Sequence, residues 1–126
     1  MQFYPCAECF AEQTLATQSL TALLRNMPEL KGIFCTGYTS TAGAITALKQ
    51  TNRKDVVLVG FDTSTELLTA LRQGWCDVLL YQNPYRQGYA TIETLTRYVV
   101  DGIKPSESKT LTRTHIVLRQ NADQYQ

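Results

Sequence analysis

Short apolar runs alternate with helical patterns along nearly the whole chain, and this alternation restricts the fold more than any other feature of the sequence. Runs rich in β-branched residues are expected to form strands: GIFCT at 32–36, DVVLVGF at 55–61, DVLLYQ at 77–82 and THIVLR at 114–119. Their nearly continuous apolar character is typical of parallel strands that are covered on both faces. We therefore expect an α/β fold, a three-layer α/β/α arrangement with a mainly parallel sheet and right-handed crossovers.

Apolar residues at helical spacing predict helices between and beside these strands. The apolar faces are, in chain order, Ala16 with Leu20, Leu23, Leu24 and Met27, then Ala44, Ile45 and Leu48, then Leu67, Leu68 and Leu71, and finally Ile92, Leu95 and Val99. Pro28 is expected to end the first helix, Gly74 the third and Gly102 the fourth. Thr39 or Ser40 is expected to cap the second helix.

The length and charge of the chain argue against several classes of protein. With 126 residues it has the size of one domain, and 12 Lys and Arg against 11 Asp and Glu give a net charge of +1. This balance argues against a strongly basic nucleic-acid-binding surface. No apolar run approaches the ~20 residues of a membrane span, and the first residues lack the charged and apolar regions of a signal peptide. The sequence as given is therefore expected to carry no export signal.

The cysteines of the chain are Cys6, Cys9, Cys35 and Cys76. Cys6 and Cys9 form a C-x-x-C pair, which occurs in redox centres and as half of a zinc site. Complete zinc sites need a second matched pair of ligands, and the only histidine is His115. Because free cysteine is a common core residue, we interpret these side chains chiefly as small buried hydrophobic groups. A disulfide or a chemical role for the pair stays open, and no metal is predicted.

The sequence lacks the common catalytic and cofactor-binding motifs. Neither G-x-x-x-x-G-K-[ST] nor G-x-G-x-x-G is present, and no G-x-S-x-G occurs. His115 falls in the middle of an expected strand, and Asp62 has no second carboxylate or histidine at a comparable strand end. We therefore expect no catalytic residues, no cofactor and no enzymatic activity.

Polar and aromatic residues follow the expected strands at the point where each strand ends. Ligands of open α/β sheets bind beyond the carboxyl ends of the strands, and this rule selects Gly37, Tyr38, Phe61, Asp62 and Gln82 as ligand-binding candidates. Carboxylate and amide groups beside aromatic rings suit a neutral polyhydroxylated ligand such as a sugar. Two alternatives stay open: Asp62 could cap the following helix, and Gln82 could simply turn the chain before the next proline.

Several segments taken together resemble a known superfamily. They are LRNMPELKGIF at 24–34, TAGA at 41–44, VLVGFD at 57–62, and QNP at 82–84 with Gly88, and in this order and spacing they resemble the type I periplasmic binding proteins. That superfamily includes the sugar-binding proteins of ABC transporters and the effector domains of LacI-type transcription regulators. The resemblance implies that Asp62 and Gln82 contact a sugar. Where the family usually has Asn-Asp, this chain has Gly37 and Tyr38, so the identity of the ligand stays open.

The resemblance also implies a domain organisation. The ligand-binding domain of the family has two lobes and is much longer than this chain. We therefore expect residues 1–126 to form a single domain, the truncated C-terminal lobe of a two-lobed sugar-binding domain. The helix at 85–102 is expected to belong to the N-terminal lobe in the intact parent protein. Its apolar face would then be uncovered in this chain, so we expect the chain to associate into a homodimer.

The resemblance leaves two functions, and the cysteines favour one of them. Cysteines without obvious pairing favour the reducing cytoplasm. We therefore expect the effector-binding domain of a cytoplasmic LacI-type regulator, in which a sugar-like small molecule closes the lobes and changes DNA binding. DNA would be contacted only through a helix-turn-helix domain absent from this sequence, and no membrane partner is expected. The alternative is an exported, periplasmic or extracellular sugar-binding protein of an ABC transporter.

Overall fold

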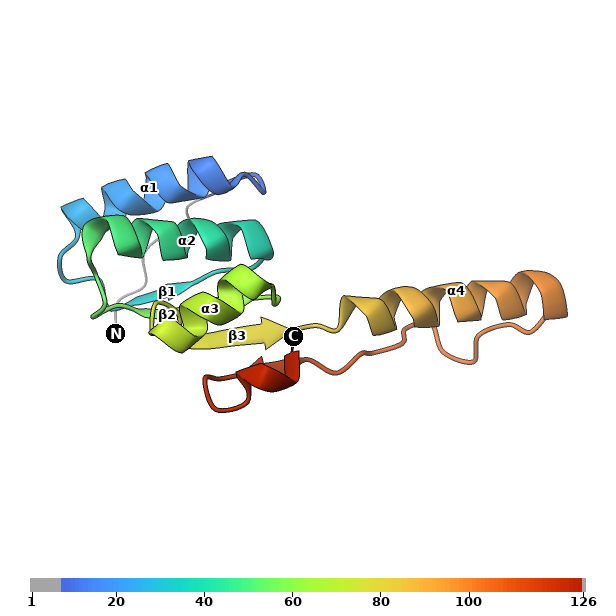
Figure 1. Ribbon diagram of the computed structural model, residues 1–126. Helices are drawn as coiled ribbons and strands as arrows, with labels where there is room; N and C mark the ends of the chain where they lie inside the picture. The colour runs from blue at the N-terminus through green and yellow to red at the C-terminus, as the bar shows by residue number, and fades with distance from the viewer. Residues whose placement is uncertain (1–7, 126) are drawn as a thin grey trace. The chain divides into compact units, whose positions relative to one another are not determined.

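The computed structural model describes residues 8–125 and confirms the predicted alternation of strands and helices. The elements in chain order are α1 (Gln13–Asn26), β1 (Gly32–Phe34), α2 (Tyr38–Thr51), β2 (Val57–Phe61), α3 (Thr65–Gln73), β3 (Val78–Tyr81), α4 (Pro84–Asp101), β4 (His115–Val117) and the 3₁₀ helix η1 (Ala122–Tyr125) (Figure 1). Each strand lies within the run that predicted it and is shorter than that run.

The chain divides into two compact units. The first unit contains Met1–Tyr81 and Ile116–Gln126 and holds the sheet together with α1, α2 and α3. The second unit contains Gln82–His115 and holds α4 and the segment that follows it. The expectation of a single domain, with the helix at 85–102 belonging to a different lobe of a longer protein, stays a prediction.

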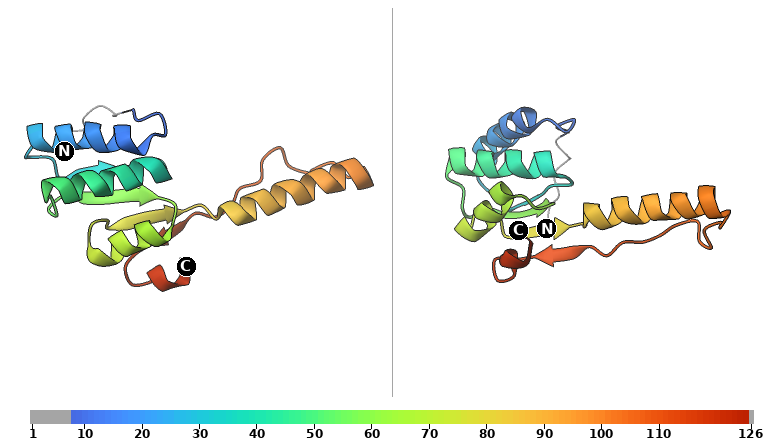
Figure 2. Two further views of the ribbon diagram at one scale, coloured as in Figure 1. Left: turned by 45° about the horizontal axis from the view of Figure 1, so that its top comes forward. Right: turned by 45° about the vertical axis from the view of Figure 1, so that its right-hand side comes forward.

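The sheet has four strands in the order β1-β2-β3-β4. β1 pairs with β2 in parallel, with Ile33 opposite Leu58, and β2 pairs with β3 in parallel, with Phe61 opposite Leu80. Figure 2 shows the arrow of β4 running opposite to that of β3. The predicted α/β fold class with a mainly parallel sheet is therefore confirmed, because the sequential parallel strands are joined through helices.

The core lies between the sheet and the helices of the first unit. Along β2 the buried residues alternate with less buried ones, so that Leu58 and Gly60 face α2. Leu79 of β3 joins Leu58 in this buried layer, and both side chains have an exposed fraction of zero. On the opposite face of the sheet Phe34 is 62% exposed and Val57 is 52% exposed. The period-2 alternation of a strand therefore places the packed residues of β2 toward α2.

The start of α2 differs from the prediction. The helix begins at Tyr38, after Gly37 in extended conformation, and no side chain caps it. The hydroxyls of Ser40 and Thr41 instead donate to the carbonyl of Gly37, at 2.9 and 2.7 Å. The predicted cap at Thr39 or Ser40 is therefore wrong. Both residues lie inside the first turn, where a hydroxyl bonds back to a carbonyl rather than accepting from an N–H.

The other predicted helix ends agree with the structure. α1 ends at Asn26, just before Pro28, which cannot continue a helix. Gly74 and Gly102 end α3 and α4 in the left-handed conformation, with φ of 75° and 69°, which glycine adopts without steric cost. Ser64 caps α3, because its side-chain oxygen accepts from the Leu67 amide at 3.2 Å.

Arg53 fixes the connection between α1 and β1. Its guanidinium donates to three backbone carbonyls at 2.8–3.3 Å, that of Leu24 in α1 and those of Pro28 and Leu30 in the connection. It also pairs with Asp55, with Nε 2.7 Å from Oδ1, and Lys31 Nζ lies 2.7 Å from Oδ2 of the same carboxylate. The hydrogen bonds from Arg53, followed by those from Lys31, hold the pKa of Asp55 well below its usual range.

Candidate functional site

The predicted ligand-binding residues of the first unit lie at one edge of the sheet. β1, β2 and β3 end at this edge, and α2 and α3 begin there (Figure 1). Gly37 and Tyr38 follow β1, while Phe61 ends β2 and Asp62 follows it. The geometry therefore brings four of the five predicted residues to the carboxyl edge, where open α/β sheets bind their ligands.

Asp62 has an unusual backbone conformation for a non-glycine residue. Its φ is 67°, and its amide donates to the carbonyl of Leu80 on β3 at 2.9 Å. Aspartate tolerates this left-handed region better than most residues, yet the conformation still costs free energy and is enriched at functional sites. Because Ser64 caps α3, the alternative that Asp62 caps this helix is wrong. Within residues 8–125 the Asp62 carboxylate has no hydrogen-bond or ion-pair partner.

Gln82 directly follows β3 and begins the second unit. Its backbone carbonyl accepts from Gln87 Nε2 at 2.9 Å. The side chain of Asn83 caps α4 by accepting from the Arg86 amide at 3.1 Å, and Pro84 follows at the first helical position. The turn into α4 is therefore made by Asn83 and Pro84. The position of the Gln82 amide relative to Asp62 stays a prediction, because the two residues belong to different units.

The two aromatic candidates, Tyr38 and Phe61, differ in their contacts and in their exposure to solvent. The ring of Phe61 packs edge-to-face on Phe34, with the ring centroids 5.9 Å apart and the planes at 89°. Tyr38 is the first residue of α2 and is 38% exposed. An added Cβ at Gly37, directly before it, would meet no atom within 4 Å. Tyr38 therefore offers a partly open ring at the edge, whereas Phe61 contributes to an aromatic pair.

The described cysteines behave mainly as core residues. Cys35 and Cys76 are buried, and Cys9 is half-buried. Burial raises the pKa of the Cys35 thiol to about 11, and burial likewise raises the pKa of Cys76 to about 12. The prediction that the cysteines are buried hydrophobic groups is thus confirmed for Cys35 and Cys76, which are protonated at neutral pH. Cys6, and with it the C-x-x-C pair, lies outside the described residues.

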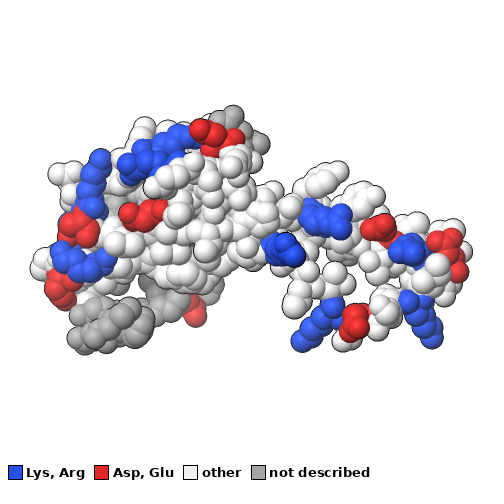
Figure 3. Space-filling model, turned by 90° about the horizontal axis from the view of Figure 1, so that it is seen from below, with Lys and Arg blue, Asp and Glu red and all other residues white. Residues whose placement is uncertain are grey.

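No cluster of three or more His, Cys, Asp or Glu suited to a metal ion occurs in the part of the chain that the structure describes. Nor does any helix there have the length and apolar character needed to cross a membrane. In the view of Figure 3, basic and acidic residues are interspersed along the rim of the first unit. The middle of that unit is formed by uncharged residues in the same view.

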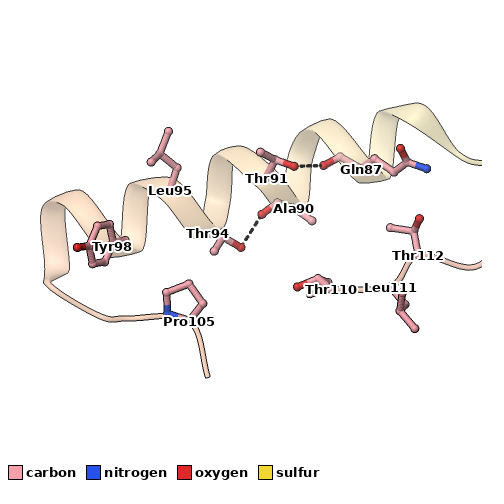
Figure 4. Close-up of a pocket in the computed structure, with 10 residues that line it drawn as sticks. All are labelled: Gln87, Ala90, Thr91, Thr94, Leu95, Tyr98, Pro105, Thr110, Leu111 and Thr112. Carbon is pink, nitrogen blue, oxygen red and sulfur yellow. Dashed lines mark hydrogen bonds between the residues drawn. The ribbon is translucent and has the colours of Figure 1, made fainter. Parts of the chain in front are cut away.

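A groove of about 760 Å³ lies within the second unit, and the sequence did not predict it. It is lined by one side of α4 and by the segment that follows the helix, at Gln87, Ala90, Thr91, Thr94, Leu95, Tyr98, Pro105, Thr110, Leu111 and Thr112 (Figure 4). The hydroxyls of Thr91 and Thr94 donate to carbonyls of their own helix at 2.8 and 2.7 Å. No lining side chain is charged, so the groove is suited to apolar contact.

The comparison with protein families identifies the class of this chain. A model described as "Periplasmic binding protein domain" matches residues 4–103, and the chain therefore belongs to this family. The D-apiose import binding protein of Paraburkholderia graminis is 27% identical over 110 residues, which cover 87% of this chain and 35% of that protein. A protein of the same name from Actinobacillus succinogenes is 27% identical over 111 residues, 36% of its length. The chain thus spans about a third of the length of these curated relatives.

Solved structures show the same fold. A solute-binding protein of an ABC transporter from Agrobacterium vitis, with bound D-fucose, has a TM-score of 0.90 and 24% identity and is matched over 97% of this chain and 42% of that one. A carbohydrate transporter solute-binding protein from Agrobacterium radiobacter, in complex with D-arabinose, has a TM-score of 0.79 and 27% identity, over 87% of this chain and 37% of that one. The predicted architecture, one α/β/α lobe of a type I periplasmic binding protein, is confirmed.

These comparisons bear on the two functions that the sequence left open. The relatives are transport binding proteins, and none of those described above is a transcription regulator. They therefore favour the alternative expectation, a sugar-binding protein of a transporter, over the LacI-type regulator that the cysteines favoured.

Proposed function

We propose that this chain is part of a solute-binding protein that delivers a sugar to an ABC-type membrane transporter and acts in the periplasm or outside the cell. The similarity to D-apiose import binding proteins over 87% of the chain carries this proposal. The similarity to a D-arabinose complex at 27% identity supports the same ligand class. The protein is non-catalytic under this proposal, and its ligand leaves chemically unchanged.

The carboxyl edge of the sheet supplies the groups that a sugar needs. The Asp62 carboxylate accepts hydrogen bonds from sugar hydroxyls, and the Gln82 side chain both donates and accepts them. Tyr38 and Phe61 supply apolar ring surface for the C–H face of the sugar, and Gly37 leaves room beside Tyr38. A neutral ligand fits this set, because the carboxylate accepts hydrogen bonds from hydroxyls without a positive charge on the ligand.

The affinity of the site depends on how much of the ligand is enclosed. Binding sites for small molecules bury most of the ligand surface, and one wall of a two-walled cleft cannot do this. Since the chain spans about a third of its curated relatives, we expect the 126-residue chain alone to bind free sugars weakly. We expect the full-length product of the gene to close a second wall over the ligand and to bind at micromolar concentration or below.

The proposal is tested by calorimetric titration of that full-length product with D-apiose, D-arabinose and D-fucose. Replacing Asp62→Ala removes a hydrogen-bonding partner that the bound sugar would bury, at a cost of about 1–3 kcal/mol, which weakens binding by about 5- to 150-fold. The control is Asp123→Asn, which removes an exposed ion pair to Arg72 and should leave the affinity unchanged. Failure of all three sugars to bind, or an Asp62→Ala variant that binds like the wild type, contradicts the proposal.

A LacI-type regulator is the second candidate, and one thiol favours it. Cys9 is free and only half-buried, as expected in a reducing compartment, whereas the buried thiols of Cys35 and Cys76 are compatible with either compartment. In this case a sugar-like effector would control DNA binding through a helix-turn-helix domain of a cytoplasmic homodimer. The coding sequence upstream of Met1 distinguishes the two candidates. A helix-turn-helix there supports the regulator, and a signal peptide supports the transport protein.

A further inference from the structure

One buried hydroxyl joins the start of α2 to the end of β2. Thr41 lies in the first turn of α2 and has an exposed fraction of zero. Its Oγ1 donates to the Gly37 carbonyl at 2.7 Å and accepts from the Phe61 amide at 2.9 Å. The same oxygen therefore contacts the two segments that carry the candidate residues of the first unit.

The hydroxyl takes the place of a missing strand partner. The amide of Val57 donates to the Lys31 carbonyl, and the amide of Cys35 donates to the Val59 carbonyl, each at 2.9 Å. In a parallel ladder every second residue of β2 points its N–H toward β1, so the donors that follow Val57 are Val59 and then Phe61. β1 ends at Phe34, and the Phe61 N–H bonds to the Thr41 hydroxyl rather than to a carbonyl of this strand. Thr41 Oγ1 satisfies the Phe61 N–H that would otherwise lack a partner.

Gly60 makes this arrangement sterically possible. A Cβ added at residue 60 would lie 2.3 Å from Thr41 Cγ2 and 2.9 Å from Thr41 Oγ1. Only a residue without a side chain lets α2 approach β2 this closely. The close approach is thus built from two residues, a glycine on the strand and a threonine on the helix.

We propose that Thr41 is a positioning residue for the sugar site, acting through Phe61 on Asp62. The inference rests on the proposed function. Asp62 follows Phe61 directly, and its own amide is held by the Leu80 carbonyl on β3. Asp62 is therefore held on the α2 side through the bond between Phe61 and Thr41, and on the β3 side through its own amide. These two bonds maintain the left-handed backbone of Asp62. Such support keeps a binding group within the narrow range of geometry that a ligand requires.

The first test measures positioning without a ligand. In Thr41→Val the shape is kept and the hydroxyl is lost, whereas Thr41→Ser keeps the hydroxyl. By NMR of the 126-residue chain, we expect the Phe61 amide to exchange about tenfold faster in Thr41→Val, and the backbone chemical shifts of Asp62 to change. Amides that donate elsewhere in the sheet, such as that of Cys35, should keep their wild-type exchange rates. In Thr41→Ser the exchange rate of the Phe61 amide and the chemical shifts of Asp62 should both stay near their wild-type values.

A uniform increase in exchange across the sheet would mean that Thr41 only stabilises the fold, and this result overturns the inference. An unchanged Phe61 amide and unchanged Asp62 shifts in Thr41→Val overturn it as well. The second test is the affinity of the full-length gene product for D-arabinose, D-apiose and D-fucose. We expect about tenfold weaker binding for Thr41→Val and near wild-type binding for Thr41→Ser. If no sugar binds the wild type, the proposed function fails, while the exchange data still decide the role of Thr41.

Discussion

Replacing Gly60→Ala tests the contact between α2 and β2 by crowding it. The added Cβ would lie 2.3 Å from Thr41 Cγ2 and 3.1 Å from Leu79 Cδ2. Carbon atoms in packed interiors are separated by about 3.5–4.0 Å at their optimum. The helix and the strand therefore have to move apart, and the hydrogen bond between Thr41 and the Phe61 amide is stretched or lost.

The size of the effect follows from three contributions. Overpacking of a buried site costs about 1–3 kcal/mol. Loss of the hydrogen bond costs about 0.5–1.5 kcal/mol net. Replacing glycine by alanine also reduces the freedom of the unfolded chain, which offsets about 0.4–1 kcal/mol. We therefore expect the free energy of unfolding to fall by about 0.5–4 kcal/mol, with a central value of about 2 kcal/mol.

The assay is urea unfolding followed by the fluorescence of Trp75, the only tryptophan of the chain. Its ring packs against the core of the first unit, and Lys54 Nζ lies 4.6 Å from the ring centroid. With an m-value of about 1–3 kcal/mol per molar urea, the midpoint should fall by about 1 M.

The matched control for this variant is Gly37→Ala. Gly37 has a φ of −168°, and no atom lies within 4 Å of an added Cβ, so the free energy of unfolding of this variant should stay within about 0.5 kcal/mol of the wild type. Equal destabilisation by the two alanines, or a Gly60→Ala midpoint at the wild-type value, would refute the steric reasoning.

Two further predictions concern charge and association. Asp55 has a pKa held below its usual range by Arg53, so its stabilisation is present above the unfolded-state pKa of about 4 and is lost as the pH falls further. Urea midpoints should show Asp55→Asn less stable than wild type at neutral pH, and the difference should shrink steadily as the pH falls below about 4; a constant difference contradicts the ion-pair account. The exposed Leu95 lies on α4, which has no buried residue, so light scattering should show concentration-dependent association that Leu95→Glu weakens and Glu93→Gln does not. A monomeric wild type at high micromolar concentration contradicts this.

Features governed by local chemistry were predictable from the sequence. The helix ends at Gly74 and Gly102 follow from the left-handed conformation that glycine adopts, and the end of α1 before Pro28 follows from the missing N–H. The position of Asp62 at the sheet edge follows from the rule that loops after parallel strands meet at one edge. Each of these expectations needs only a few neighbouring residues and the alternation of strands and helices.

Features governed by distant contacts were not predictable. The bond between Thr41 and Phe61 joins residues 20 apart, and no local pattern reports it. The predicted cap of α2 was wrong because the helix begins at Tyr38, earlier than expected, so that Ser40 lies inside the first turn and donates to the carbonyl of Gly37. Asp62 belongs to a residue type that often caps helices and lies two positions before Ser64, so the sequence alone did not distinguish the two, and Ser64 is the residue that caps α3.

The preference for a regulator over a transport protein depended on the number of cysteines. The structure shows why this number is a poor marker of the compartment. Cys35 and Cys76 are buried in the core, where each fills the place of a small apolar side chain. Burial raises the pKa of both thiols and so keeps them protonated. Protonated and inaccessible thiols react slowly with oxidants, so such residues are compatible with either compartment.

The lack of any buried residue on α4 has a consequence for how the chain unfolds. The 18 residues of this helix are held by their own backbone bonds and by the caps at Asn83 and Gly102. Helices supported in this way melt gradually, because no packed core makes their loss all-or-none. Far-UV circular dichroism records this gradual melting together with the cooperative loss of the first unit, whereas Trp75 records only the latter. The two signals should therefore give transitions that do not coincide, and a single melting temperature describes only the first unit.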